Sequence, residues 1–178
     1  MRFCATILLC FLVASAYGQK YVDDDTPYNF RDRAYGGLGL GGLGFGSHST
    51  LGNYFSIGVS ALGGYMLTKN LSAGIGFEYQ YTSYGQADIK NHVYGGYPFV
   101  RYNIKNFFLQ ADYNMYNIEI RYRDNKASET SDRMLVGIGF SSPTRGRGYF
   151  NFLVSYDFLY SSTSPWGSPL NTRMFFTF

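Results

Sequence analysis

LSAGIGFEYQYTSY, residues 71–84, alternates apolar and polar side chains without a break. Ile75 and Phe77 fall on one face of this stretch, whereas Gly76 and Glu78 fall on the other. Because successive side chains of a β-strand point to opposite faces, the stretch predicts a strand with one apolar and one polar face. Such a strand suits a soluble β-protein, but it also suits a membrane barrel with lipid outside and polar groups inside.

The same pattern recurs along the chain and predicts an all-β fold, an eight-stranded antiparallel up-and-down transmembrane β-barrel. Each strand reaches the roughly 9–11 residues that a tilted membrane strand requires. An open sheet edge in hydrocarbon would leave backbone groups without partners, so we expect the first strand to pair with the eighth. The expected strands are at about residues 35–46, 53–67, 71–84, 92–104, 107–122, 133–142, 148–160 and 170–178.

The connections between these strands are expected to alternate in length. Short turns are predicted at residues 68–70 and 105–106, whereas the polar connections at the opposite end are longer. This alternation is typical of outer-membrane barrels, in which the short turns face the periplasm. The longer, outward-facing loops are expected at residues 47–52, 85–91, 123–132 and 161–169.

The first residues predict export. Residues 1–18 combine Arg2, a short apolar core and a run of mostly small residues, which is typical of a cleaved signal peptide. Residues 19–34 are polar, without a period, and are expected to form a flexible leader before the barrel at 35–178. Both cysteines, Cys4 and Cys10, lie in the signal, so the barrel is expected to have no disulfide or thiolate metal site.

The charge balance is nearly neutral. The chain carries 15 basic and 12 acidic side chains, a formal net charge of +3. This balance favours neither nucleic acid nor a strongly acidic partner.

Alternation also places charged side chains inside the predicted barrel, four acids against four arginines. An eight-stranded barrel has room inside for little except side chains, so these charges are expected to pack together as a network. Glycines such as Gly76 and Gly139 on the same face would leave space for the guanidinium groups. The residues expected in the network are Glu78, Asp112, Glu119, Asp157, Arg101, Arg121, Arg133 and Arg173.

Two details of this placement depend on register. If the last two strands pair symmetrically about their loop, Asp157 lies opposite Arg173 and forms an ion pair with it. The alternation slips in the fifth strand, where Met115 and Ile118 both favour the lipid side, and again near Gly41-Gly42. Both slips are interpreted as β-bulges.

Tyrosines are expected to form aromatic girdles at the two membrane interfaces. Trp166 in the last loop is interpreted as another interface or packing group. The tyrosines expected at the loop end are Tyr54, Tyr81, Tyr84, Tyr94, Tyr97, Tyr122 and Tyr160, and those at the turn end are Tyr35, Tyr65, Tyr102 and Tyr149.

Two motifs suggest other functions. Residues 39–44 match the G-x-G-x-x-G spacing of dinucleotide sites, but the helix that such a site needs does not follow, so we interpret them as a glycine-rich strand. The two histidines, His48 and His92, lie near the loop end with Ser47, Ser49 and Asp88 nearby. No spacing fixes a catalytic triad or a metal site there, and solvated loop residues are the simpler interpretation.

The chain resembles the small eight-stranded outer-membrane β-barrels, the group related to the OmpA-like transmembrane domain and to OmpX-like porin-family proteins, over residues 35–178. The resemblance rests on residues 64–71 at the turn between the second and third strands, 98–102 in the fourth strand and 174–178 in the last strand. It implies location in the outer membrane of a Gram-negative cell. It also implies recognition of Phe176 and Phe178 by the barrel-assembly machinery, although Arg173 stands where that signal usually has glycine.

Fold alone does not choose a role. The expected function is a structural or surface-binding barrel without enzymatic activity or cofactor, with outer-membrane lipid as a partner and a possible extracellular ligand at the loops. The loop of residues 123–132 is the most charged of these loops and is the expected contact surface. Three alternatives stay open, namely a narrow pore for small solutes, a lipid-modifying enzyme and a soluble barrel of the calycin type.

Overall fold

The structure is a computed structural model of the whole chain. It describes residues 33–48, 52–85, 89–122, 125–146, 148–161, 164–166 and 168–178, without the side chains of 41–48, 52, 54, 122, 125 and 126. The predicted signal peptide and nearly all of the predicted leader lie outside the described residues. Within the described part of the chain, no helix is long and apolar enough to cross a membrane.

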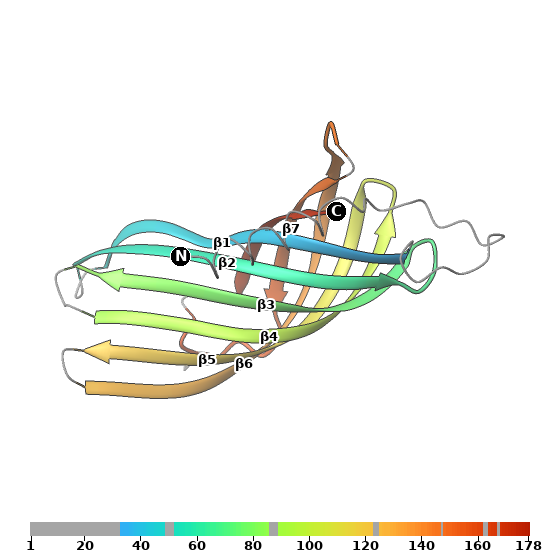
Figure 1. Cartoon of the computed structure of the whole chain (residues 1–178). Helices are drawn as coiled ribbons and strands as arrows, with labels where there is room; N and C mark the ends of the chain where they lie inside the picture. The colour runs from blue at the N-terminus through green and yellow to red at the C-terminus, as the bar shows by residue number, and fades with distance from the viewer. Residues whose placement is uncertain are drawn as a thin grey trace, which may run out of the picture.

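Eight strands form a closed antiparallel barrel in sequence order, which confirms the predicted fold (Figure 1). Closure is made by β1 and β8, where Leu38 pairs with Phe176 and Gly39 with Phe175. The backbones of Gly36 and Phe178 also exchange hydrogen bonds of 3.0 and 2.9 Å. The strands are β1 (Ala34–His48), β2 (Gly52–Met66), β3 (Leu71–Tyr84), β4 (Ile89–Ile104), β5 (Phe107–Tyr122), β6 (Asn125–Pro143), β7 (Tyr149–Asp157) and β8 (Leu170–Thr177).

The connections at one end of the barrel are short, as expected. β2 and β3 are joined by residues 67–70, β4 and β5 by Lys105 and Asn106, and β6 and β7 by residues 144–148. Lys105 has φ of 54°, the left-handed conformation that such a tight turn requires. This end, which also holds the β1–β8 closure at Phe178, is called the turn end below, and the opposite end the loop end.

The loop end differs from the prediction at the fifth connection. Residues 125–132 belong to β6, so only residues 123–124 link β5 to β6. The predicted loop 123–132 is therefore mostly a long β-hairpin. The long connection at this end is instead 158–169, because β7 stops at Asp157, and β7 and β8 are the shortest strands.

The two expected bulges have different outcomes. The register of β1 against β2 shifts between Gly41 and Gly44, which confirms the irregularity near Gly41-Gly42. β5 keeps one register against both β4 and β6 over its whole length, so the predicted bulge is wrong. Met115 therefore faces outward at 52% exposure, whereas Ile118 points into the barrel at 5%.

Candidate functional site

The barrel interior contains a cluster of polar side chains around Arg173 of β8. Nη1 of Arg173 donates to Oδ2 of Asp112 at 2.8 Å, and Nη2 donates to Oδ1 of Asn114 at 2.7 Å. Glu78 of β3 lies 3.4 Å from the same guanidinium group and accepts a 2.9 Å hydrogen bond from the hydroxyl of Tyr116. All of these residues except the partly buried Glu78 are at most 5% exposed.

Strand geometry explains how this cluster forms. Asp112, Asn114 and Tyr116 are alternate residues of β5, so all three point inward. Arg173 reaches them across the lumen, because the hydrogen-bonded neighbours of β8 are β7 and β1 rather than β5. The ion pair therefore joins opposite walls of the barrel.

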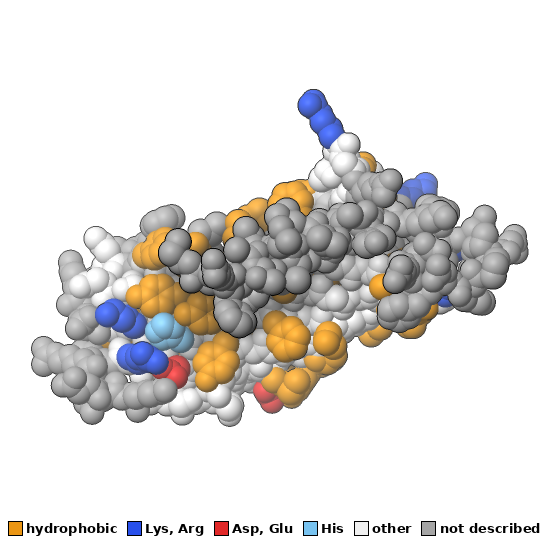
Figure 2. All heavy atoms as spheres, in the orientation of Figure 1, with side chains coloured by type: hydrophobic (Ala, Val, Ile, Leu, Met, Phe, Trp, Pro, Cys, Tyr) orange, Lys and Arg blue, Asp and Glu red, His pale blue; other side chains and the backbone are white. Residues whose placement is uncertain are grey.

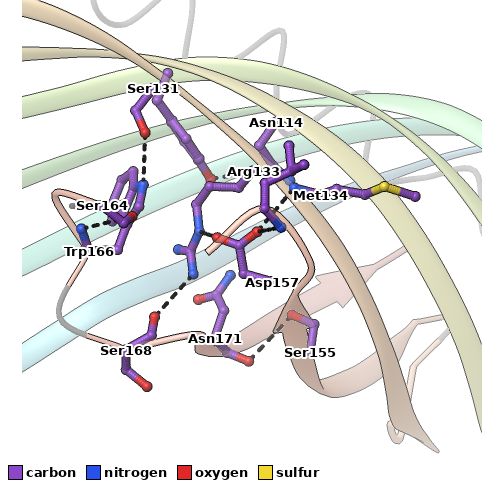
Figure 3. Close-up of polar contacts among 12 residues, drawn as sticks. Asn114, Ser131, Arg133, Met134, Ser155, Asp157, Ser164, Trp166, Ser168 and Asn171 are labelled. Carbon is purple, nitrogen blue, oxygen red and sulfur yellow. Dashed lines mark hydrogen bonds and ion pairs between the residues drawn. The ribbon is translucent and has the colours of Figure 1, made fainter. Parts of the chain in front are cut away.

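A second ion pair joins Arg133 of β6 to Asp157 of β7, with Nε 2.7 Å from Oδ2 (Figure 3). The other carboxylate oxygen of Asp157 accepts hydrogen bonds from the backbone N–H groups of Met134 and Leu159. The Arg133 guanidinium group also lies 4.6 Å from the Trp166 ring, and the indole N–H of Trp166 donates to Ser131. This cluster ties the 158–169 connection to the barrel wall.

Arg101 of β4 differs from these two arginines because no carboxylate touches it in the described part of the chain. Its Nε and Nη2 both donate to Oε1 of Gln110, at 3.0 and 2.8 Å. The guanidinium group stacks on Phe108 at 4.4 Å and on Phe175 at 5.1 Å. Nε2 of Gln110 donates a hydrogen bond to Oδ1 of Asp112, so the Gln110 amide links Arg101 to the Arg173 cluster.

The predicted pair of Asp157 with Arg173 is wrong. β7 and β8 pair with Tyr156 opposite Leu170, which sets Arg173 opposite Leu153 instead of Asp157. The prediction assumed a symmetric loop, but the long connection ends where the backbone N–H of Asp157 bonds the carbonyl of Pro169. Each residue consequently has a different partner, Arg133 for Asp157 and Asp112 for Arg173.

Glu119 and Arg121 were also expected inside the barrel, but the register of β5 puts both at outward positions, although Glu119 is only 8% exposed there. Their inward placement required the bulge in β5 that the register excludes. Glu119 pairs across the strands with His92, which pairs with Tyr81 on the outward face of β3. Glu119 and Arg121 form an ion pair there, and the Arg121 side chain is 55% exposed.

The inward glycines make room for aromatic rings rather than directly for guanidinium groups. A Cβ at Gly76 would overlap the Tyr97 ring, and a Cβ at Gly139 would overlap the Phe108 ring. These rings in turn face the arginines, since Arg173 lies 4.6 Å from Tyr97 and Arg101 lies 4.4 Å from Phe108. Each glycine thus leaves space for an aromatic ring, and the ring in turn contacts an arginine.

Seven buried side chains form an apolar layer across the barrel. Arg101 and the turn-end residues lie on one side of this layer, and the Arg173 cluster lies on the other side. Tyr35 and Tyr97 belong to this layer, at 6% and 3% exposure, so their expected places in the outer girdles are wrong. Tyr94 and Tyr102 do face outward. Tyr149 is exposed at the end of β7 but lies on its inward face, opposite the buried Thr177, so its expected girdle place is also wrong. The side chains of Tyr54 and Tyr122 lie outside the described residues. The layer consists of Tyr35, Leu62, Tyr97, Phe99, Phe108, Leu153 and Phe175.

The neutral polar partners in the interior do not emerge when only ionisable residues are assigned to the two faces of each strand. Gln110, Asn114 and Tyr116 lie on the same strand and the same face as Asp112, two or four residues away. The period-2 alternation that placed Asp112 inside would have placed them there as well.

The outer face of the barrel is apolar along most of its length and changes to polar near the loop end. Phe77, Met115 and Ile138 are each more than half exposed. Beyond Met115, the next outward residue of β5 is Asn117, which accepts a hydrogen bond from the outward Ser128 of β6. Figure 2 shows hydrophobic side chains along the flank and basic, acidic and histidine side chains at one end.

The residues considered for catalysis or metal binding are not brought together in the described structure. His92 lies on the outer face, where its Nδ1 is 2.8 Å from the Tyr79 hydroxyl. The side chains of His48 and Ser47, and all of Ser49 and Asp88, lie outside the described residues. Among the residues that are described, no group of three or more His, Cys, Asp or Glu side chains could hold a metal ion.

The two residues of the expected assembly signal lie at the turn end. Phe176 is outward and 53% exposed, and its ring lies 5.3 Å from that of Phe150. Phe178 is paired with Gly36 through its backbone. Their recognition by the assembly machinery stays a prediction.

Fold and site together define the chain as a closed eight-stranded barrel with an apolar exterior and buried ion pairs inside. No protein-family model matches the sequence, and no curated protein matches it. Among solved structures, the chain is similar to Neisserial surface protein A (NspA), with 13% sequence identity and a TM-score of 0.44. That match covers 81% of this chain and 93% of NspA.

Proposed function

We propose that this protein is an outer-membrane β-barrel with a structural or surface-binding role and a sealed interior. The observation that carries the proposal is the inside-out distribution of side chains. Large apolar side chains such as Ile75, Phe107 and Leu109 are about half exposed on the outside, whereas Asp112, Arg133 and Arg173 are buried inside. A water-soluble protein rarely exposes so continuous an apolar surface.

The dimensions of the apolar surface support a membrane-spanning barrel. On β5 the outward apolar side chains extend from Phe107 to Met115. At about 3.4 Å per residue this stretch is about 27 Å long, close to what a tilted strand needs to cross the hydrocarbon layer. Outer-membrane lipid is then the partner along this band, and the barrel-assembly machinery the partner during insertion.

The packing of the lumen supports a sealed barrel over a pore. Three arginines and three carboxylates are paired or stacked across it, namely Arg101, Arg133, Arg173, Glu78, Asp112 and Asp157. The apolar layer closes the section between Arg101 and the Arg173 cluster. Opening a pore would require breaking buried ion pairs, which costs several kcal/mol each.

The β5–β6 hairpin supports the surface-binding role. Residues 117–122 of β5 continue beyond the apolar band, which at about 3.4 Å per residue adds about 20 Å of strand. Its outward positions are polar, including the exposed Ser128 and Thr130 on β6. We propose this hairpin, rather than a flexible loop, as the contact surface for an extracellular ligand, and we assign the chain no catalytic step or cofactor.

Cell fractionation combined with bilayer recording tests the proposal. The mature chain is expected in the outer-membrane fraction, with a gel mobility that changes on heating, and it is expected to give no steady conductance in planar bilayers. Steady single-channel openings would favour the pore, and recovery of the folded chain without detergent would favour a soluble barrel. A change in the mass of outer-membrane lipid on expression would favour the enzyme.

A further inference from the structure

A polar cavity of about 230 Å³ opens at the turn end of the barrel, below the apolar layer. Its lining includes Lys69 and Lys105 from two turns, Asn103 from β4, Asn151 from β7 and Arg101 at the inner limit. A water molecule occupies about 30 Å³, so the cavity has room for a small polyatomic ion together with water. This turn-end cavity is separate from the two ion-pair clusters of the lumen.

Arg101 brings a positive charge to this cavity that no carboxylate in the described part of the chain contacts. The residue is only 5% exposed, and its Nε and Nη2 are both used by the neutral oxygen of Gln110. Among the residues that the structure describes, Nη1 of Arg101 has no hydrogen-bond acceptor, and it is not among the fully buried atoms that lack one. Nη1 therefore keeps some accessible surface, and Arg101 lines the cavity.

The surroundings of the cavity add positive charge. Lys69 and Lys105 line the cavity. Arg33, which donates to the backbone carbonyls of residues 66 and 67, and Arg145, in the β6–β7 turn, lie at the same end. The acidic side chains that the structure describes lie in the Arg173 cluster or towards the loop end. A concave site lined by one sign of charge concentrates ions of the opposite sign.

We propose that the turn-end cavity binds a phosphate group, with Arg101 at its inner limit and Lys69 and Lys105 at its rim. A guanidinium group presents directed N–H donors that match the oxygens of a phosphate, and lysines add positive charge. Asn103 and Asn151 supply amide groups in the same cavity. Either a free phosphate ion or the headgroup phosphate of a membrane lipid could supply this chemistry.

The test is a titration of the folded, isotope-labelled mature chain in a maltoside detergent, which contains no phosphate. Inorganic phosphate is added at constant ionic strength, and amide NMR signals are followed. Saturable shifts are expected at the side-chain amides of Asn103 and Asn151. The double variant Lys69→Gln/Lys105→Gly is expected to weaken binding by about tenfold or more, because two charge-assisted contacts are lost.

The variants are chosen to leave the barrel folded. Both lysines are exposed in turns, and glycine readily adopts the left-handed conformation of Lys105. Arg145→Gln is the matched control, because Arg145 is exposed in a turn at the same end but does not line the cavity, and it is expected to leave the affinity unchanged. Arg101→Gln adds a direct test of the inner limit wherever this variant keeps the heat-dependent gel shift.

Lipid nanodiscs that contain phosphatidylglycerol distinguish the two sources. The same shifts without added phosphate would assign the site to the lipid headgroup, whereas a need for added phosphate would assign it to the free ion, and both results support the site. Shifts that do not saturate, or an equal weakening in Arg145→Gln and in the lysine variant, would overturn the proposal because they indicate general charge screening.

Discussion

At the scale of single residues, Asp157 makes three directed contacts at the loop end. One carboxylate oxygen accepts from Arg133 at 2.7 Å, and the other accepts from the backbone N–H groups of Met134 and Leu159. It therefore joins β6, β7 and the start of the 158–169 connection. Because Asp157 is 2% exposed, removal of its partner would leave a buried charge without compensation.

We expect Arg133→Ala and Asp157→Ala each to destabilise the barrel by about 3–5 kcal/mol, since each leaves the other charge buried. The double variant is expected to cost less than the sum of the two, by about 1–3 kcal/mol. Reversible urea unfolding in phospholipid vesicles, followed by tryptophan fluorescence and gel mobility, measures these free energies. Strictly additive losses would contradict the pairing.

A second double-mutant cycle, on Asp157 and Arg173, is the control. These two residues share no partner among the contacts that the structure describes, because Arg173 contacts Asp112, Glu78 and Asn114. Their effects are therefore expected to add within about 0.5 kcal/mol. The contrast between the two cycles distinguishes the observed register of β7 and β8 from the symmetric one.

At the scale of strands, side-chain alternation predicts most of the barrel but fails where both faces of a strand are polar. The bounds of β3 and β5 agree with the prediction, because one face of each strand is continuously apolar over most of its length. Residues 125–132 of β6 contain no large apolar side chain, so nothing in their sequence marks a strand. Their pairing with β5 extends the hairpin beyond the apolar band.

The interior was predictable by residue type but not by partner. Alternation alone places Asp112, Asp157 and Arg173 inward, because each lies on the polar face of a regular strand. Which arginine meets which carboxylate depends on strand register and on contacts across the lumen, and neither is local in sequence. The apolar Ile118 was expected to face lipid, but it packs inside with Val93 and Tyr116.

Packing between neighbouring strands gives a prediction at Gly139 of β6. It lies opposite Phe108 of β5, and a Cβ there would overlap the Phe108 ring. Gly139→Ala is expected to cost about 1–3 kcal/mol, because the ring must move away from the Arg101 guanidinium group that it stacks on. Urea unfolding in vesicles measures the loss.

Gly63→Ala is the matched control for this substitution. Gly63 lies on β2 in the same barrel, but a Cβ there would meet no atom within 4 Å. Its effect is expected to stay within about 0.5 kcal/mol. Equal losses at the two glycines would show that strand glycines matter for backbone reasons rather than for the space that the Phe108 ring occupies.

At the scale of the whole molecule, the height of each side chain along the barrel decides its surroundings as much as the face it is on. β6 shows this on one strand, because Ser128, Thr130, Val136 and Ile138 are all on its outward face. Val136 and Ile138 lie within the apolar band, whereas Ser128 and Thr130 lie on the hairpin beyond it. The proposed membrane boundary therefore falls between Thr130 and Val136.

Spin labels at these four positions of β6, in the barrel inserted into phospholipid vesicles, test that boundary. Labels at Val136 and Ile138 are expected to collide mainly with oxygen, which concentrates in acyl chains, and labels at Ser128 and Thr130 mainly with a water-soluble nickel chelate. Because strand and face are the same for all four, only height along the barrel can produce the reversal. Nickel collisions at all four positions would mean that water surrounds the apolar band, and the chain would then be a soluble barrel whose apolar exterior needs another partner.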